Sequence, residues 1–223
     1  MKDKIEVITT GDGSSSLYNP QLDETYHSSH GAITESRHVF IQEGLDFIYS
    51  GQEEINILEV GFGTGLNAIL TLEKAETIKT KINYVTLELY PLEMKLIDEL
   101  NYKSYFPKTL QEKYEVLHKA DWAKAVEVTP NFTLTKLETS LENYETDQLF
   151  DLVYFDAFGP RKQPEMWTAD FLAQATKPMK KGGTLVTYCA MGQFRRDLKS
   201  LGLAVEKVPG PPGKREMTRG VKV

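Results

Sequence analysis

The chain has 223 residues, of which 40% are hydrophobic and 26% charged, a composition typical of one globular domain with an extension. Its beginning, Met1-Lys-Asp-Lys-Ile-Glu, lacks the apolar run of a signal peptide, and no stretch reaches the ~18 apolar residues of a membrane span, so neither secretion nor membrane insertion is predicted. The net charge of −6 argues against a general nucleic-acid binder, and the single cysteine, Cys189, fits a reducing cytoplasm, where we expect the protein.

The first 50 residues predict a small unit that precedes the main fold. Residues 5–10 and 16–18 are strand-like and are joined by Gly11-Asp12-Gly13, which favours a hairpin. Residues 33–48 carry apolar side chains at helical spacing. We expect residues 1–50 to pack as a lid on a second unit, residues 51–223. The histidines in this part have no Cys or acidic partner at ligand spacing, so no metal site is predicted.

A strand, a glycine-rich turn and a helix are predicted next. The run Ile-Asn-Ile-Leu-Glu-Val at 55–60 is typical of a buried parallel strand, and 66–72 is helical in pattern. Gly61, Gly63 and Gly65 lie between them. Glycine allows close backbone approach, so a ligand can sit against this turn and bond the free amides at the helix start.

An acid before the turn narrows the class of ligand. Leu66 stands where the dinucleotide fingerprint G-x-G-x-x-G needs its last glycine, which disfavours NAD and FAD. Glu59, two residues before Gly61, gives a pattern that resembles class I S-adenosylmethionine-dependent methyltransferases. The resemblance implies that Glu59 helps to hold the ammonium group of the cofactor and that Gly61, Gly63, Gly65 and Asn67 line its site. The alternative is a glycine turn with no ligand.

The second strand, residues 82–88, ends in Glu88. An acid at this place, after a glycine turn, can accept hydrogen bonds from both ribose hydroxyls of a nucleoside cofactor. Glu88 is therefore the second cofactor candidate, and the alternative is an ordinary surface carboxylate.

The following elements complete an α/β pattern. Pro91 is expected to start a helix, a charged helix-like region runs to about Val128, and residues 132–137 and 149–156 read as strands. The alternation predicts a Rossmann-like α/β fold, with a mostly parallel sheet covered by helices on both faces.

The last of these strands ends in Asp156, followed by Ala-Phe-Gly-Pro. Ligands of open α/β sheets collect at the carboxyl ends of strands, so Asp156 and Phe158 are expected to face the same crevice as the glycine turn. Cys189 lies in a further apolar strand and is expected to be a packing residue.

Several motifs together resemble one family, the methyltransferase domain of the bacterial tRNA-modifying enzyme MnmC. The segments that carry the resemblance are Glu-Val-Gly-Phe-Gly-Thr-Gly-Leu-Asn at 59–67, Glu-Leu-Tyr-Pro-Leu at 88–92, Phe-Asp-Ala-Phe-Gly-Pro-Arg-Lys-Gln-Pro-Glu-Met-Trp at 155–167, Lys-Gly-Gly-Thr-Leu-Val-Thr-Tyr at 181–188, Phe-Arg-Arg-Asp-Leu at 194–198 and Pro-Gly-Pro-Pro-Gly-Lys-Arg-Glu-Met at 209–217, with weaker matches at 23–28 and 35–40. The likeness covers nearly the whole chain.

The resemblance implies methylation of the amine of 5-aminomethyl-2-thiouridine at the tRNA wobble position. Asp156 would orient the amine and receive its proton or stabilise the new ammonium, and Phe158 would stack on the flipped uracil. No room is left for the FAD-dependent oxidase domain of bifunctional members, so the chain looks like a stand-alone methyltransferase without FAD or metal. No obligate protein partner or membrane contact is indicated.

The C-terminal part supplies the candidates for binding the anticodon region of tRNA. Residues 177–223 hold 11 Lys or Arg against 3 Asp or Glu, which can form a phosphate-binding face, although a solvated basic tail gives the same count. The candidates are Arg195, Arg196, Lys199, Lys214, Arg215 and Arg219.

Two choices stay open at this point. Methyltransferases of this class commonly bind the adenine amino group with an acid after the third strand, where this chain has Ser140; Asp121 is the alternative. For the reaction, the alternatives are methylation of a small amine or a protein, aminopropyl transfer from decarboxylated S-adenosylmethionine, and cofactor binding without catalysis.

Overall fold

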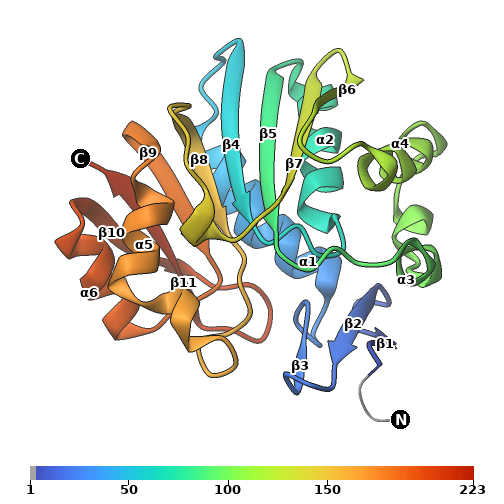
Figure 1. Cartoon of the computed structure of the whole chain (residues 1–223), viewed down its shortest axis with the longest axis horizontal. Helices are drawn as coiled ribbons and strands as arrows, with labels where there is room; N and C mark the ends of the chain where they lie inside the picture. Colours follow the sequence, from blue (N-terminus) through green and yellow to red (C-terminus); the bar gives the residue numbers. More distant parts are fainter. Residues whose placement is uncertain (1–3) are drawn as a thin grey trace.

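The computed structural model describes residues 4–223, and its centre is an eight-stranded sheet with the strand order β10-β11-β9-β8-β4-β5-β7-β6 (Figure 1). These strands are β4 (Glu54–Val60), β5 (Lys81–Glu88), β6 (Ala125–Thr129), β7 (Phe132–Glu138), β8 (Phe150–Phe155), β9 (Met179–Thr187), β10 (Leu203–Pro209) and β11 (Glu216–Lys222). The pairs β9–β8, β8–β4, β4–β5 and β5–β7 are parallel, and β11 and β6 pair antiparallel with their neighbours β9 and β7. The predicted, mostly parallel α/β sheet is confirmed.

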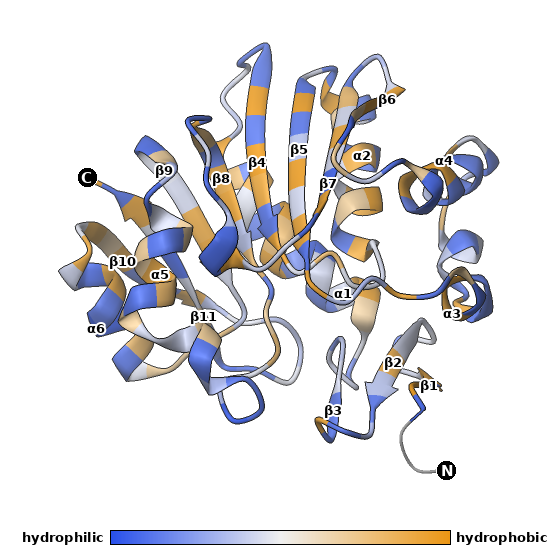
Figure 2. Cartoon of the chain, in the orientation of Figure 1, coloured by the Kyte–Doolittle hydropathy of each residue, from blue (hydrophilic) through white to orange (hydrophobic). Residues whose placement is uncertain are grey.

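Helices cover both faces of this sheet. They are α1 (Ala32–Ser36), the π-helical η1 (Arg37–Asp46), α2 (Leu66–Ile78), α3 (Met94–Glu99), α4 (Lys108–Lys119), α5 (Ala169–Thr176) and α6 (Gly192–Ser200), with short 3-10 turns η2 (Tyr102–Tyr105), η3 (Leu141–Asn143) and η4 (Pro164–Trp167). In β8, Leu152 and Tyr154 join the hydrophobic cluster under η1 and α2, whereas Val153 and Phe155 join the cluster under α5 and α6. Both faces of the central strands are therefore core, and Figure 2 shows them banded with hydrophobic residues.

The strand order places one edge of the sheet at a topological switch point. From β4, the chain continues through α2 to β5 on one side, whereas β8 lies on the other side of β4. The connections leave in opposite directions, which opens a crevice at the carboxyl ends of β4 and β8. The glycine turn lies at this point.

The N-terminal residues form a second, three-stranded sheet of β1 (Glu6–Thr9), β2 (Ser15–Asn19) and β3 (Glu24–Thr25), which lies below the carboxyl edge of the main sheet in Figure 1. Asp12, in its hairpin turn, accepts hydrogen bonds from the backbone N–H (3.0 Å) and the hydroxyl (2.8 Å) of Thr34 at the start of α1. Leu17 and Phe40 are buried in the same cluster as the main sheet. The predicted hairpin and helix are confirmed; the division at residue 50 stays a prediction, and residues 1–3 lie outside the described part.

One predicted element is wrong. The helix-like region extends only to Lys119, and residues 125–129 form the edge strand β6. The sequence Ala-Val-Glu-Val-Thr alternates, and Pro130-Asn131 turns the chain back so that β6 pairs with β7. The charged side chains along this stretch obscured a period of two.

The C-terminal strand has an unusual place in the sheet. β11 is inserted between β9 and β10, and β10 is hydrogen-bonded to the sheet only through β11. The segment before β11 carries Lys214 back toward the crevice. Within residues 4–223, no helix is both long and apolar enough to cross a membrane.

Candidate active site

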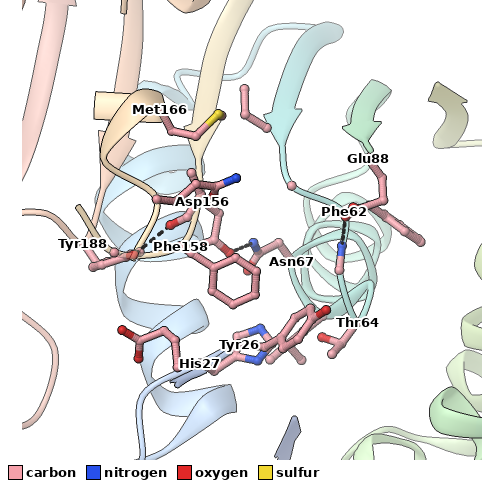
Figure 3. Close-up of a pocket in the computed structure, with 18 of the residues that line it drawn as sticks. Tyr26, His27, Phe62, Thr64, Asn67, Glu88, Asp156, Phe158, Met166 and Tyr188 are labelled. Atoms are coloured by element: carbon pink, nitrogen blue, oxygen red, sulfur yellow. Dashed lines mark hydrogen bonds between the residues drawn. The ribbon is translucent and has the colours of Figure 1, made fainter. Parts of the chain in front are cut away.

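A cavity of about 440 Å³ opens at the carboxyl edge of the main sheet (Figure 3). It is lined by the segment between β3 and α1, by the glycine turn, by the residues after β5, β7 and β8, and by Tyr188 and Lys214. The predicted residues that it brings together are Gly61, Gly63, Asn67, Glu88, Ser140, Asp156, Phe158 and Lys214.

The glycine turn needs glycine for steric reasons. Gly61 has φ of 98°, and a Cβ atom there would lie 2.9 Å from the carbonyl oxygen of Asp156. Gly65 has φ of 69°, and its Cβ atom would lie 2.8 Å from Nε2 of His118. Any other residue at these positions would push the turn away from the strand ends.

The three glycine amides of this turn already donate hydrogen bonds within the protein. Gly61 N–H donates to the Leu87 carbonyl (3.0 Å), Gly65 N–H to the Phe62 carbonyl (2.8 Å), and Gly63 N–H to Oε2 of Glu88 (2.8 Å). The helix α2 starts at Gly65 without a side-chain cap, so the donors left for a ligand belong to its first turn.

Glu88 links this turn to the end of β5. Its Oε2 accepts from Gly63 N–H, and its Oε1 accepts from Tyr90 N–H at 2.8 Å. Each carboxylate oxygen has a second lone pair, and the carboxylate lines the cavity, so Glu88 can accept two further hydrogen bonds from a ligand.

Ser140 and Asp121 have different positions. Ser140 follows β7 and lines the cavity, and its buried Oγ has no hydrogen-bond partner within residues 4–223. Asp121 is exposed, pairs with Lys124 (2.7 Å) and does not line the cavity. A buried hydroxyl without a partner fits a ligand atom that would complete its hydrogen bonds.

Asp156 forms the opposite wall. Its Oδ2 accepts a hydrogen bond from Nδ2 of Asn67 at 2.8 Å (Figure 3). Burial raises the pKa of the Asp156 carboxyl to about 7, whereas the Asn67 hydrogen bond and the charge of Lys214 act to lower it. A carboxyl with this pKa can exchange a proton near neutral pH.

Aromatic and charged residues surround the space in front of Asp156. The rings of Tyr26 and Phe158 meet edge to face with centroids 4.9 Å apart. Lys214 pairs with the buried Glu35, and its Nζ lies 4.2 Å from the centre of the Tyr188 ring. Tyr26, Glu35 and Tyr188 were not predicted as site residues; the available signal was the family match around residues 23–28, 35–40 and 181–188.

Glu59 does not lie where the sequence pattern suggests. It is fully buried and does not line the cavity, and its Oε2 accepts a hydrogen bond from Thr86 Oγ1 at 2.7 Å. Tyr84 and Asn67 lie beside it, and Asn67 separates it from Asp156. It therefore does not border the space that a ligand in the cavity would fill. Gly65 is also absent from the lining residues.

The basic candidates separate into buried and exposed groups. Arg195 is 6% exposed and bonds Thr218 Oγ1 (3.0 Å), Glu216 Oε1 (2.9 Å) and the Met217 carbonyl (3.1 Å), so it is not available to a phosphate. Arg219 is similarly occupied by Glu43 and Glu206. Arg196 and Arg215 are exposed.

We expect Arg195→Leu to lower the free energy of unfolding by about 2 kcal/mol, because charge-assisted hydrogen bonds between α6 and β11 are lost. Arg196→Leu is the matched control: it removes the same charge from the next residue, an exposed arginine whose guanidinium bonds Gln193, and should change stability by less than about 0.5 kcal/mol. Urea denaturation measures both, and equal effects would contradict a structural role for Arg195.

A second groove of about 540 Å³ adjoins the cavity and shares Glu24, Gly159, Tyr188 and Lys214 with it. Its other walls carry Arg161 and Arg215, both exposed. A ligand bound in front of the Asp156 side chain can therefore extend into a groove that carries two arginines.

Comparison with known proteins decides the family. The family model described as "S-adenosyl-L-methionine-dependent methyltransferase" matches residues 101–223, more than half of the chain. The chain belongs to this methyltransferase family.

Relatives and solved structures agree with the assignment. The methyltransferase is 30% identical, over 96% of its length, to the "tRNA 5-methylaminomethyl-2-thiouridine biosynthesis bifunctional protein MnmC" of Cupriavidus metallidurans, and 32% identical, over 89%, to that of Pseudomonas fluorescens. It spans about a third of the length of these curated relatives, 33% and 32% respectively. The crystal structure of MNMC2 from Aquifex aeolicus superposes with a TM-score of 0.82 at 27% identity, covering 98% of this chain and 70% of that one.

A more distant likeness shows the fold alone. Spermidine synthase from Thermotoga maritima matches with a TM-score of 0.54 at 11% identity, over 98% of this chain and 72% of that chain. The class I methyltransferase fold expected from the sequence is confirmed. The polar groups that line the cavity also fit the family's cofactor. They include the Glu88 carboxylate, which accepts hydrogen bonds, and the Ser140 hydroxyl, which has no partner among the described residues.

Proposed function

We propose that this methyltransferase methylates the amine of 5-aminomethyl-(2-thio)uridine at the wobble position of tRNA, giving 5-methylaminomethyl-(2-thio)uridine. The observation that carries the proposal is the match over nearly the whole chain to proteins named for the biosynthesis of this nucleoside. The family's cofactor, S-adenosylmethionine, supplies an electrophilic methyl group when bound. The chain's own residues bind, orient and accept the proton.

The cofactor half of the cavity lies beside the glycine turn. Glu88 accepts hydrogen bonds from the two ribose hydroxyls while it keeps its bonds to the backbone. Ser140 takes the adenine edge, because its buried hydroxyl has no partner within the protein. Gly61 and Gly63 let the ligand approach the backbone, and Asn67 stands between this half and Asp156.

The acceptor half is the part of the cavity in front of the Asp156 side chain. The Asp156 carboxylate accepts a hydrogen bond from the amine, orients its lone pair and receives its proton. A carboxylate alone also favours the protonated, unreactive amine. The ammonium group of Lys214 lines the same cavity and opposes that effect, although its pairing with Glu35 reduces its strength. The effects of Asp156 and Lys214 on the protonation of the amine therefore partly cancel.

A base enters this half only after it leaves the anticodon stack. Phe158 and Tyr26 present an edge-to-face pair against which a flipped uracil can stack. The adjoining groove then receives the phosphates beside the flipped nucleotide, and Arg161 and Arg215 neutralise them. Arg196 and Lys199 lie outside both hollows and are second-rank candidates for more distant phosphates.

The proposal is tested by incubating the protein with S-adenosylmethionine and tRNA that carries 5-aminomethyl-2-thiouridine, followed by mass spectrometry of the nucleosides. We expect a mass gain of one methyl group on this nucleoside only. Polyamines and bulk protein serve as rival acceptors, and decarboxylated S-adenosylmethionine tests aminopropyl transfer. Methylation of a rival at a higher kcat/KM, with the tRNA nucleoside unchanged, would overturn the proposal.

Charge reversal tests the groove. The double variant Arg161→Glu/Arg215→Glu should weaken tRNA binding by at least tenfold at low salt and make the salt slope shallower by about two, one for each lost phosphate contact. Lys119→Glu together with Lys108→Glu makes the same charge change on α4, outside both hollows, and is the matched control. Fluorescence titration at several salt concentrations measures both; equal losses would show a non-specific charge effect.

A further inference from the structure

An amide side chain separates two carboxyl groups beneath the cavity. Asn67, at the start of α2, is 3% exposed and donates its Nδ2 hydrogen to Oδ2 of Asp156 at 2.8 Å. On its other side lies Glu59 at the end of β4, which is 0% exposed. The three side chains come from three adjacent elements and form a row of polar groups from the core to the cavity wall.

Two ionised carboxylates would leave one acceptor in this row without a donor. Among the described residues, Oε1 of Glu59, Oδ1 of Asn67 and the hydroxyl of Tyr84 are buried and form no hydrogen bond of normal geometry. The Tyr84 hydroxyl lies where it can donate to Glu59, so the acceptor left without a donor is Oδ1 of Asn67. An amide presents a donor nitrogen to one neighbour and an acceptor oxygen to the other. If the nitrogen faces Asp156, the oxygen faces Glu59 and needs a proton there; if the amide is reversed, Asp156 must carry the proton. In either arrangement, one proton on the pair gives Oδ1 of Asn67 a donor, whereas two ionised carboxylates leave it without one.

The surroundings decide which carboxyl holds it. Glu59 is sealed from solvent by β5 and β8, and the polar groups near it are the neutral hydroxyls of Thr86, Tyr84 and Tyr154. Asp156 lines the cavity, faces Glu35 and Tyr188, and has the positive charge of Lys214 nearby. An isolated charge costs least at the cavity wall.

We propose that Glu59 is protonated in the folded enzyme and donates to Oδ1 of Asn67, which fixes the Asn67 amide so that its nitrogen holds Asp156 as an aimed, ionised carboxylate. Glu59 is then a positioning residue that acts through Asn67, and not a ligand of the cofactor. The inference concerns the protein alone and does not rest on the identity of the methyl acceptor.

The titration behaviour of the pair agrees with this arrangement. Burial raises the pKa of Glu59 to about 8, and the hydrogen bond from Thr86 opposes that rise only in part. Burial, and to a smaller extent the charge of Glu35, also raise the pKa of Asp156, but only to about 7, because the Asn67 hydrogen bond and the charge of Lys214 favour its charged form. The deeper carboxyl therefore keeps the proton when the other has lost it.

Infrared spectroscopy of the protein without cofactor or tRNA tests the proposal directly. At pH 7.5, we expect a band of a protonated carboxyl group in the wild type. The band should disappear in Glu59→Gln, whose amide can donate the same hydrogen bond, and persist in Asp156→Asn. Asp151→Asn is the matched control: Asp151 pairs with Lys180 at 2.8 Å, and its replacement should leave the band unchanged.

The opposite results would overturn the proposal. A wild-type spectrum without the band would show that both carboxyls are ionised, and loss of the band in Asp156→Asn alone would place the proton on Asp156. Calorimetry adds a second criterion. If Glu59 instead bound the cofactor's ammonium as an ionised ligand, Glu59→Gln would weaken S-adenosylmethionine at least tenfold; we expect a change of less than threefold.

A variant of Glu59 that cannot donate a hydrogen bond distinguishes its positioning role from a role in packing. Glu59→Leu keeps the volume but leaves Oδ1 of Asn67 without a donor, so the amide is free to reverse and the pKa of Asp156 should rise. Carbon-13 NMR of labelled aspartate follows this titration in both variants. We expect the Asp156 midpoint to stay at the wild-type value in Glu59→Gln and to move up in Glu59→Leu; equal midpoints in both would refute the positioning role.

Discussion

Asp156→Asn is expected to lower kcat by roughly 10²–10⁴-fold, the usual loss when a positioned proton acceptor is removed. The variant keeps the size of the side chain and can still meet Asn67, but it cannot receive the amine proton or balance the new ammonium. The affinity for S-adenosylmethionine should stay within a few-fold, because Asp156 lies on the acceptor side of Asn67. Steady-state kinetics with the modified tRNA and calorimetry with the cofactor measure the two quantities.

The role of Asp156 as a proton acceptor also predicts how turnover depends on pH. Asp156 works in its ionised form, and burial raises its pKa to about 7, so wild-type turnover should fall as pH drops through 7. Deprotonation of the amine acts in the same direction. On the acidic side of the pH profile, log kcat should therefore rise by at least one unit per pH unit. Asp151→Asn, on β8, the strand after which Asp156 follows, should retain the wild-type profile. Turnover of Asp156→Asn within threefold of wild type would remove this carboxyl from the chemistry.

Glu88→Ala should weaken S-adenosylmethionine binding by roughly 100-fold. Hydrogen bonds to a charged group contribute about 1.5 kcal/mol or more each, and two lost ribose contacts amount to about 3 kcal/mol, or two decades of Kd. The variant also frees the N–H groups of Gly63 and Tyr90, which loosens the turn. Calorimetry measures the Kd directly.

A matched pair distinguishes ribose binding from turn stability. Glu88→Gln preserves one acceptor oxygen and the side-chain length, so it should give an intermediate Kd. Glu93→Ala removes an exposed carboxylate five residues on, outside the lining of the cavity, and is the control. A wild-type Kd in Glu88→Ala would show that the ribose is held elsewhere.

The sequence was sufficient for the central strands and for much of the cavity. β4, β5 and β8 are continuous apolar runs between turn residues, so their period and length leave little choice of structure. Once they are parallel neighbours, their carboxyl ends must meet at one edge. For this reason, the sequence alone could predict that Glu88 and Asp156, which are 68 positions apart, lie in one crevice.

Other features depend on side-chain depth and distant contacts, which periodicity does not report. Glu59 fits a ligand-binding pattern, yet its position on β4 points it under the turn and not into the cavity. Arg195 and Arg196 are equally basic, but only the helix register decides that one is buried against β11. The pairing of Glu35 with Lys214 joins residues from opposite ends of the chain.

The place of β11 also determines when the site can exist during synthesis. Because β11 pairs on both sides, β10 has no strand partner until residues 216–222 have left the ribosome. The same late segment brings Lys214 to Glu35, which is made early. The nascent chain can therefore build the cofactor half first, but its acceptor wall closes only after residues 214–222 have been made, so a chain that stops before them has no complete place for a substrate.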